Sequence, residues 1–266
     1  MATGRLRFYS LSQMGQANIV YVIPRDVPEF MTMGNKNYER PMKTLYLLHG
    51  ISGNECDWEY NGIAEDIAFK YNMAVIMVTA GNNFYLDRKA TGCQYCTYVG
   101  KEVVEFTRKM FGLSDKQEDT LIGGLSMGGF GAIHTGFAFP ETFGGVIALS
   151  SALIIHQIAS MKSGDADEIA NYDYYKEVFG DLDKVEESDA NPEVLYDRNV
   201  KEGKTNPPVY MAVGTEDFLY QNNQIMKKFL EDKGANMKYE EGPGIHDWTF
   251  WNAYITKGVE WVLENV

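Results

Sequence analysis

Short apolar runs rich in β-branched and aromatic residues alternate along the chain with stretches of amphipathic spacing. The runs are short enough to be buried strands, and we predict strands at residues 7–9, 19–23, 44–49, 74–79, 120–124, 145–150, 209–213 and 237–240. After the first two runs, most are followed by a helical pattern, which is typical of a mostly parallel sheet with helices on both faces. The first two strands can form an antiparallel edge.

The helical patterns place apolar residues three or four positions apart, so that they share one face of a helix. Such sets are Ile63, Ile67 and Tyr71; Val99, Val103, Phe106 and Met110; and Ile225, Phe229 and Leu230, the last closed by Gly234 as a C-cap. We also expect helices at residues 130–139 and 248–263. The fold class predicted is therefore α/β, with an eight-stranded sheet flanked by helices.

The segment between the sixth and seventh predicted strands is longer than a plain crossover needs, since it exceeds fifty residues. We therefore predict an inserted helical cap at residues 155–205 within one domain that spans residues 1–266. Residues 163–198 contain twelve acidic and three basic side chains, a net −9 out of −13 for the whole chain. This acidic insert is either a solvated helical surface or a lid that disfavours anionic substrates.

Composition and charge exclude several classes of protein. The chain has 266 residues, 45% hydrophobic and 23% charged, which is ordinary for a globular domain and unlike disordered or collagen-like chains. The net charge of −13 argues against nucleic acid as a partner, because phosphates would be repelled. The N-terminus lacks a secretory signal and no apolar stretch is long enough for a membrane span, so we expect a cytoplasmic protein that does not bind membranes.

The three cysteines do not form a disulfide framework. Cys93 and Cys96 form a C-x-x-C pair, and Cys56 stands apart. A zinc site would need a second pair of ligands, and thioredoxin-like chemistry would need a different βαβ context. We interpret the thiols as structural or incidental.

The strongest chemical motif is a G-x-S-x-G sequence at residues 124–128, with Ser126 at its centre. It follows a predicted strand and leads into a predicted helix, which is the context of a nucleophile elbow. The serine of such an elbow sits on a strained turn, where side chains two positions away on either side would collide. A dinucleotide-binding turn is excluded because His134 stands where the third glycine belongs.

A serine nucleophile needs a histidine base and a carboxylate that orients the histidine, in the chain order Ser, Asp or Glu, His. His246 lies in a Gly/Pro loop between the last predicted strand and the last helix, and we predict it as the base. The acid follows the strand at 209–213; Asp217 is preferred and Glu216 is the alternative, because one residue of register decides between them. Asp247 more plausibly caps the last helix.

Two further histidines are interpreted as structural. His134 lies on the helix that follows the serine, and His156 lies in the insert, where it could also line the cap.

An oxyanion hole needs two backbone N–H groups near the reacting carbonyl. Met127 directly follows the serine and supplies the first. The loop after the strand at 44–49 reads His49-Gly50-Ile51-Ser52-Gly53, and we predict the Ile51 N–H as the second donor.

Four segments together resemble the esterase D-like family of α/β-hydrolases, a group with tributyrin, feruloyl and acetyl-xylan esterases and S-formylglutathione hydrolases. They are LLHGISGNECDW at 47–58, GGLSMGGFGA at 123–132, GTEDFLY at 214–220 and GIHDWTFW at 244–251. HGISGN and GTEDFLY are most similar to the tributyrin esterase branch. The chain departs from the family pattern at residues 93–110 and in the acidic insert.

The resemblance implies an α/β-hydrolase fold and a serine carboxylesterase that hydrolyses short-chain acyl esters. It implies Ser126, Asp217 and His246 as the triad and Ile51 and Met127 as oxyanion donors, with no cofactor. Its alternatives are a feruloyl or acetyl-xylan esterase and an S-formylglutathione thioesterase. The acidic insert argues mildly against the thioesterase, because glutathione carries a net negative charge. A non-catalytic binding module and a serine peptidase are further, less favoured alternatives.

The expected partner is a small-molecule or carbohydrate-linked ester, and a homodimer is possible. Among the aromatic residues that could border the substrate, Trp248 is the one we predict to line the pocket, with core packing as the alternative.

Overall fold

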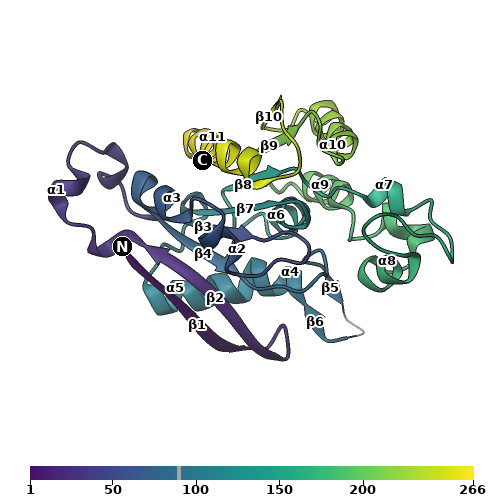
Figure 1. Cartoon of the computed structure of the whole chain (residues 1–266), viewed down its shortest axis with the longest axis horizontal. Helices are drawn as coiled ribbons and strands as arrows, with labels where there is room; N and C mark the ends of the chain where they lie inside the picture. Colours follow the sequence, from purple (N-terminus) through teal and green to yellow (C-terminus); the bar gives the residue numbers. More distant parts are fainter. Residues whose placement is uncertain (89–90) are drawn as a thin grey trace.

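The computed structural model describes residues 1–88 and 91–266 and is built around one eight-stranded sheet (Figure 1). The strand order is β1-β2-β4-β3-β7-β8-β9-β10. Strand β2 runs antiparallel to both β1 and β4, and all other pairs are parallel. The bounds are β1 Ala2–Ser10, β2 Gly15–Ile23, β3 Lys43–Leu48, β4 Met73–Val78, β7 Thr120–Leu125, β8 Gly145–Leu149, β9 Val209–Gly214 and β10 Met237–Gly242. The predicted fold class is confirmed.

The central strands are buried on both faces. Every residue of β3, β4, β7, β8 and β9 is buried, as expected for parallel strands covered by helices on both sides. Successive side chains enter opposite cores: Tyr46 and Leu48 of β3 pack on one side, and Leu45 and Leu47 on the other. The near-continuous apolar runs in the sequence reflect this double burial.

Strand β1 differs from its prediction, because the strand expected at residues 7–9 extends over Ala2–Ser10. It lies at the edge of the sheet and pairs with β2 along its whole length. Its exposure alternates instead of being uniformly low. The apolar residues of β1 predict only part of the strand, and pairing with β2 extends it to its full length.

Helices cover both faces of the sheet. One core contains buried residues of α5 (Val103–Phe111), α6 (Met127–Ala138), α9 (Pro192–Lys201) and α10 (Tyr220–Asp232). The other contains those of α2 (Asp57–Tyr60), α3 (Ala64–Tyr71) and α11 (Trp248–Asn265). The helix expected through Val99 and Met110 is interrupted: α4 (Tyr95–Thr97) and a π-helical turn at Tyr98–Glu102 precede α5.

The segment between β8 and β9 contains α7 (Ile155–Ile158), α8 (Tyr172–Phe179), the 3₁₀ helix η5 (Leu182–Glu187) and α9. In Figure 1, α7 and α8 lie together at one end of the molecule. Helix α9 instead packs on α6, where the Asn199 side chain donates to the carbonyl of Phe137 at 2.7 Å. Helix α9 therefore lies against α6, the helix that covers β7 and β8, whereas α7 and α8 lie at the end of the molecule (Figure 1).

The remaining elements are short. A two-stranded hairpin joins β5 (Asp87–Arg88) to β6 (Cys93–Gln94), and α1 (Glu29–Thr32) lies on a loop that projects at the opposite end from α8 (Figure 1). Single 3₁₀ turns occur at η1 (Pro24–Asp26), η2 (Lys36–Tyr38) and η4 (Gln117–Asp119). No helix in the described part of the chain has both the length and the apolar character that crossing a bilayer requires.

Candidate active site

Ser126 occupies a strained turn between β7 and α6. Its φ of 54° and ψ of −120° lie outside the regions that residues with a side chain normally adopt. Two glycines allow this turn: a Cβ on Gly124 would lie 2.3 Å from the carbonyl oxygen of Gly128, and one on Gly128 would lie 2.4 Å from that of Leu48. The turn places Ser126 at the wall of a cavity, which is the geometry the G-x-S-x-G sequence predicts.

His246 meets a carboxylate that is already held in place. Its Nδ1 lies 2.8 Å from Oδ2 of Asp217, whose side chain is fully buried and whose Oδ1 accepts the Leu219 N–H at 2.8 Å. Burial raises the pKa of Asp217, but the hydrogen bonds from His246 and Leu219 outweigh it and hold the pKa below its usual value. An ionised Asp217 that accepts a hydrogen bond from the Nδ1–H of His246 leaves Nε2 free to accept a proton.

The structure also places the other candidate acids and histidines. Glu216 is exposed and accepts the N–H of Gly244 at 2.7 Å, away from His246. Asp247 caps α11, where its side chain accepts the N–H of Phe250 at 3.0 Å, as predicted. Of the two carboxylates left open by the sequence, Asp217 is the one that contacts His246.

The remaining histidines lie apart from the serine. His134 is buried on α6, with Nε2 2.8 Å from the carbonyl oxygen of Asp189. His156 lies between two carboxylates of the insert, Glu186 at 2.6 Å and Glu193 at 3.0 Å. Neither lines the cavity that contains Ser126.

Ile51 and Met127 line the same cavity as Ser126. Neither backbone N–H is used in a hydrogen bond within residues 1–88 and 91–266. Two unused donors beside a serine side chain are what an oxyanion hole requires. The assignment of both groups as oxyanion donors stays a prediction.

His49 fixes the loop that carries Ile51, a role that the sequence analysis did not assign. Its Nε2 accepts the Ala80 N–H at 3.0 Å, so the ring proton resides on Nδ1 and donates to the carbonyl of Gly50 at 2.7 Å. The hydroxyl of Tyr85 donates to the His49 carbonyl at 3.0 Å. Burial lowers the pKa of His49, which keeps the ring neutral. The signal available in the sequence was the His-Gly pair at the end of a buried strand.

The cavity at Ser126 has a volume of about 470 Å³ and a floor that is mostly apolar. It is lined by Ile51, Phe84, Ser126, Met127, Ala152, Ile154, Gln157, Asp167, Glu168, Ile169, Tyr175, Phe218, Leu219 and His246. Sequence reasoning missed Phe84, Phe218 and the residues of the insert, because only the folded chain brings them to the serine. Trp248 packs edge-on against Trp58 and Trp251, with ring centres 5.1 and 5.3 Å apart, and is not among the lining residues.

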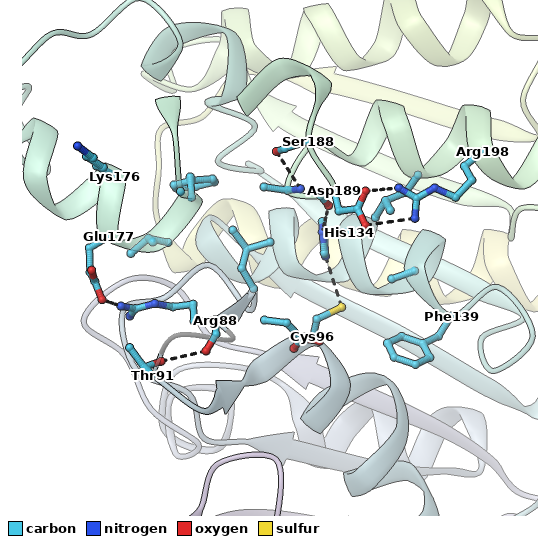
Figure 2. Close-up of a pocket in the computed structure, with 18 residues that line it drawn as sticks. Arg88, Thr91, Cys96, His134, Phe139, Lys176, Glu177, Ser188, Asp189 and Arg198 are labelled. Carbon is cyan, nitrogen blue, oxygen red and sulfur yellow. Dashed lines mark hydrogen bonds and ion pairs between the residues drawn. The ribbon is translucent and has the colours of Figure 1, made fainter. Parts of the chain in front are cut away.

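A second cavity of about 730 Å³ lies between the β5–β6 hairpin, α6 and the insert (Figure 2). Ion pairs of Arg88 with Glu177 and of Arg198 with Asp189 border it. Cys96 is buried there, 3.5 Å from His134, and burial raises the pKa of its thiol. The Cys93 and Cys96 thiols are free, and no group of three potential metal ligands occurs in the described ranges.

The comparisons with known proteins agree with this geometry. The profile of the Esterase family, described as "Putative esterase", matches residues 28–262. The chain belongs to this esterase family. An acetyl esterase of Caldicellulosiruptor saccharolyticus is 41% identical over 262 residues, 98% of each chain. The enzyme is therefore a carboxylic ester hydrolase, as predicted, and acts on esters; assignment to the tributyrin branch stays a prediction.

Two solved structures of Staphylococcus aureus share the fold of this esterase over 98% of each chain. FphF, a fluorophosphonate-binding serine hydrolase in a substrate-bound form, has a TM-score of 0.83 and 27% identity. The S-formylglutathione hydrolase FrmB has a TM-score of 0.81 and 28% identity. Over the 98% of this esterase that the two alignments cover, it has the α/β-hydrolase fold.

Proposed function

We propose that this esterase hydrolyses short-chain acyl esters through a covalent acyl-serine intermediate, with Ser126, His246 and Asp217 as its triad. The observation that carries the proposal is the cavity itself, which holds Ser126 and His246 together while a buried, ionised Asp217 holds the far side of the imidazole. A neutral imidazole oriented in this way is the base that a serine hydroxyl needs.

In the first step, the Ser126 oxygen attacks the ester carbonyl while its proton passes to Nε2 of His246. The carbonyl oxygen becomes an oxyanion that accepts the N–H groups of Ile51 and Met127, each worth on the order of 3 kcal/mol to the barrier. Collapse of this intermediate breaks the ester bond, and the alcohol leaves with the proton from His246. Water, activated by the same nitrogen, then hydrolyses the acyl-serine and restores both side chains.

The acyl group of the substrate meets a mostly apolar lining, in which Phe84, Met127, Ala152 and Ile154 accompany Ser126 in a cavity of about 470 Å³. The acetyl esterase relative supports an acetyl group as the acyl part. The same proposal includes a small-molecule or carbohydrate-linked ester as the substrate. It also includes a homodimer as the assembly.

We also propose that the part of the insert before α9 acts as a cap. Gln157, Asp167, Glu168, Ile169 and Tyr175 come from that part and form one side of the cavity. Substrate therefore enters between the insert and the loops at the ends of β3, β7 and β9.

The test compares initial rates of the wild type and Ser126→Ala. The substrates are p-nitrophenyl acetate, butyrate and octanoate, methyl ferulate, acetylated xylan and S-formylglutathione. We expect rates that fall steeply with acyl length and that Ser126→Ala abolishes, while Ser163→Ala, an exposed serine outside the cavity, retains them. A preference for ferulate, xylan or S-formylglutathione would replace the short-chain assignment, and rates independent of Ser126 would overturn the mechanism.

A further inference from the structure

The wall that the insert contributes to the catalytic cavity carries two carboxylates, those of Asp167 and Glu168. No lysine or arginine occurs among its lining residues in the part of the chain that the structure describes. The His246 side chain lines the same cavity, at the reacting end. The cavity thus combines a mostly apolar lining with two carboxylates on one wall.

Asp167 is fixed in place by the hydrogen bonds it accepts. The Tyr175 hydroxyl lies 2.9 and 3.0 Å from its two carboxylate oxygens, and the backbone N–H groups of Ile169 and Ala170 donate at 2.9 Å. The Gln157 side chain adds a donor at 3.2 Å. All of these groups donate to the carboxylate, which therefore holds the loop at the cavity wall.

Glu168 is the freer of the two carboxylates. It is exposed, and it makes no hydrogen bond or ion pair within residues 1–88 and 91–266. Lys162, a cation of the same segment, is paired instead with Asp183 at 2.7 Å. The charge of Glu168 is therefore not neutralised by the insert and acts on whatever enters the cavity.

We propose that Asp167 and Glu168 are specificity-determining residues that select against esters with a negative charge and favour neutral or cationic ones. This inference rests on the proposed function, since it concerns the substrate of the same serine. A carboxylate or phosphate on the ester would approach the held carboxylate of Asp167 and the unpaired one of Glu168 within a mostly apolar lining, where repulsion is stronger than in water. A cationic or hydroxyl-bearing alcohol would be attracted by the same groups.

The experiment uses three aryl acetates of one shape and different charge. They are 4-acetoxybenzoate (anionic), its methyl ester (neutral) and 4-acetoxy-N,N,N-trimethylanilinium (cationic). The kcat/KM measured for each ester is divided by the rate constant for hydrolysis of the same ester by hydroxide. This division removes differences in leaving-group reactivity. In the wild type at low ionic strength, we expect this corrected kcat/KM to be highest for the cationic ester, lower for the neutral ester and lowest for the anionic ester.

Glu168→Gln removes one charge and keeps the size of the side chain. We expect it to raise the anionic-to-neutral ratio of kcat/KM about five- to tenfold and to lower the cationic-to-neutral ratio by a similar factor. Salt near 0.5 M should shrink both changes, because it screens exposed charges. The matched control is Glu187→Gln, which removes the same charge from an exposed position in the acidic insert that lines neither cavity, and its ratios should equal those of the wild type.

Ratios that are unchanged in Glu168→Gln, or that change equally in Glu187→Gln, would overturn the inference while the neutral ester still reports the esterase activity. Loss of all turnover that depends on Ser126, including that of the neutral ester, would instead overturn the proposed function and the inference with it.

Discussion

The two sides of the catalytic cavity are built in different ways. On the sheet side, Ile51 and Ser126 come from tight turns directly at the ends of the buried strands β3 and β7. On the insert side, Asp167 and Glu168 lie in a loop that side-chain hydrogen bonds hold to α7 and α8. The comparison teaches that backbone geometry positions the reacting groups, whereas polar side chains of an added segment shape the entrance for the substrate.

The largest effect should come from the acid on the sheet side. Asp217→Asn should lower kcat on the order of 10⁴-fold, because the amide no longer holds His246 in the orientation and tautomer that the reaction needs. Glu216→Gln is the matched control: Glu216 contacts the Gly244 backbone and not His246, so we expect a change of less than about threefold. Kinetics with p-nitrophenyl acetate measure both, and a larger loss in Glu216→Gln would reverse the assignment.

A smaller but still large effect should follow from filling the space at the nucleophile turn. In Gly124→Ala, the added methyl group would lie 2.3 Å from the Gly128 carbonyl oxygen, so the turn must move and the free energy of unfolding should fall by about 2 to 4 kcal/mol. In Gly15→Ala, the nearest atom would be 3.7 Å away, and we expect little change. Urea unfolding measures both; equal stabilities would mean that the turn is not sterically fixed.

The smallest effect should come from the insert side and depend on pH. Burial alone would lower the pKa of His156, but hydrogen bonds to Glu193 and Glu186 outweigh it and raise the pKa. The charged pairs therefore contribute their full stability below the unfolded pKa of about 6.5 and lose it as pH rises through the folded pKa. Because the side chain is 35% exposed, solvent screens the pairs, and the contribution should be about 1 kcal/mol or less.

The measurement for this effect is the free energy of unfolding at pH 6 and pH 9. The wild type should lose stability relative to His156→Gln over this range, while p-nitrophenyl acetate hydrolysis by the variant at pH 8 should stay close to the wild-type rate. A difference between the two proteins that does not vary with pH would contradict a charged His156.

Much of the sheet side could be predicted from the sequence because its determinants are local. The continuous apolar runs of β3, β7 and β9 specify buried parallel strands, and the glycines at 124 and 128 specify the turn at Ser126. The Gly/Pro loop before α11 indicated His246. The long interval between β8 and β9 showed only that a segment was inserted, not which of its residues face the serine.

The sequence by itself determined the eight strands of the main sheet along the chain, the nucleophile turn and the histidine, because each depends on spacing within a few residues. Tertiary structure decided that Asp217 contacts His246 while Glu216 contacts the backbone of Gly244. The two acids are adjacent in the chain after β9, so a shift of one residue would exchange their directions. It also decided that Trp248 packs against Trp58, and that Asp167, Glu168 and Phe218 reach the cavity. These contacts join residues far apart in the chain, and no local pattern encodes such distances.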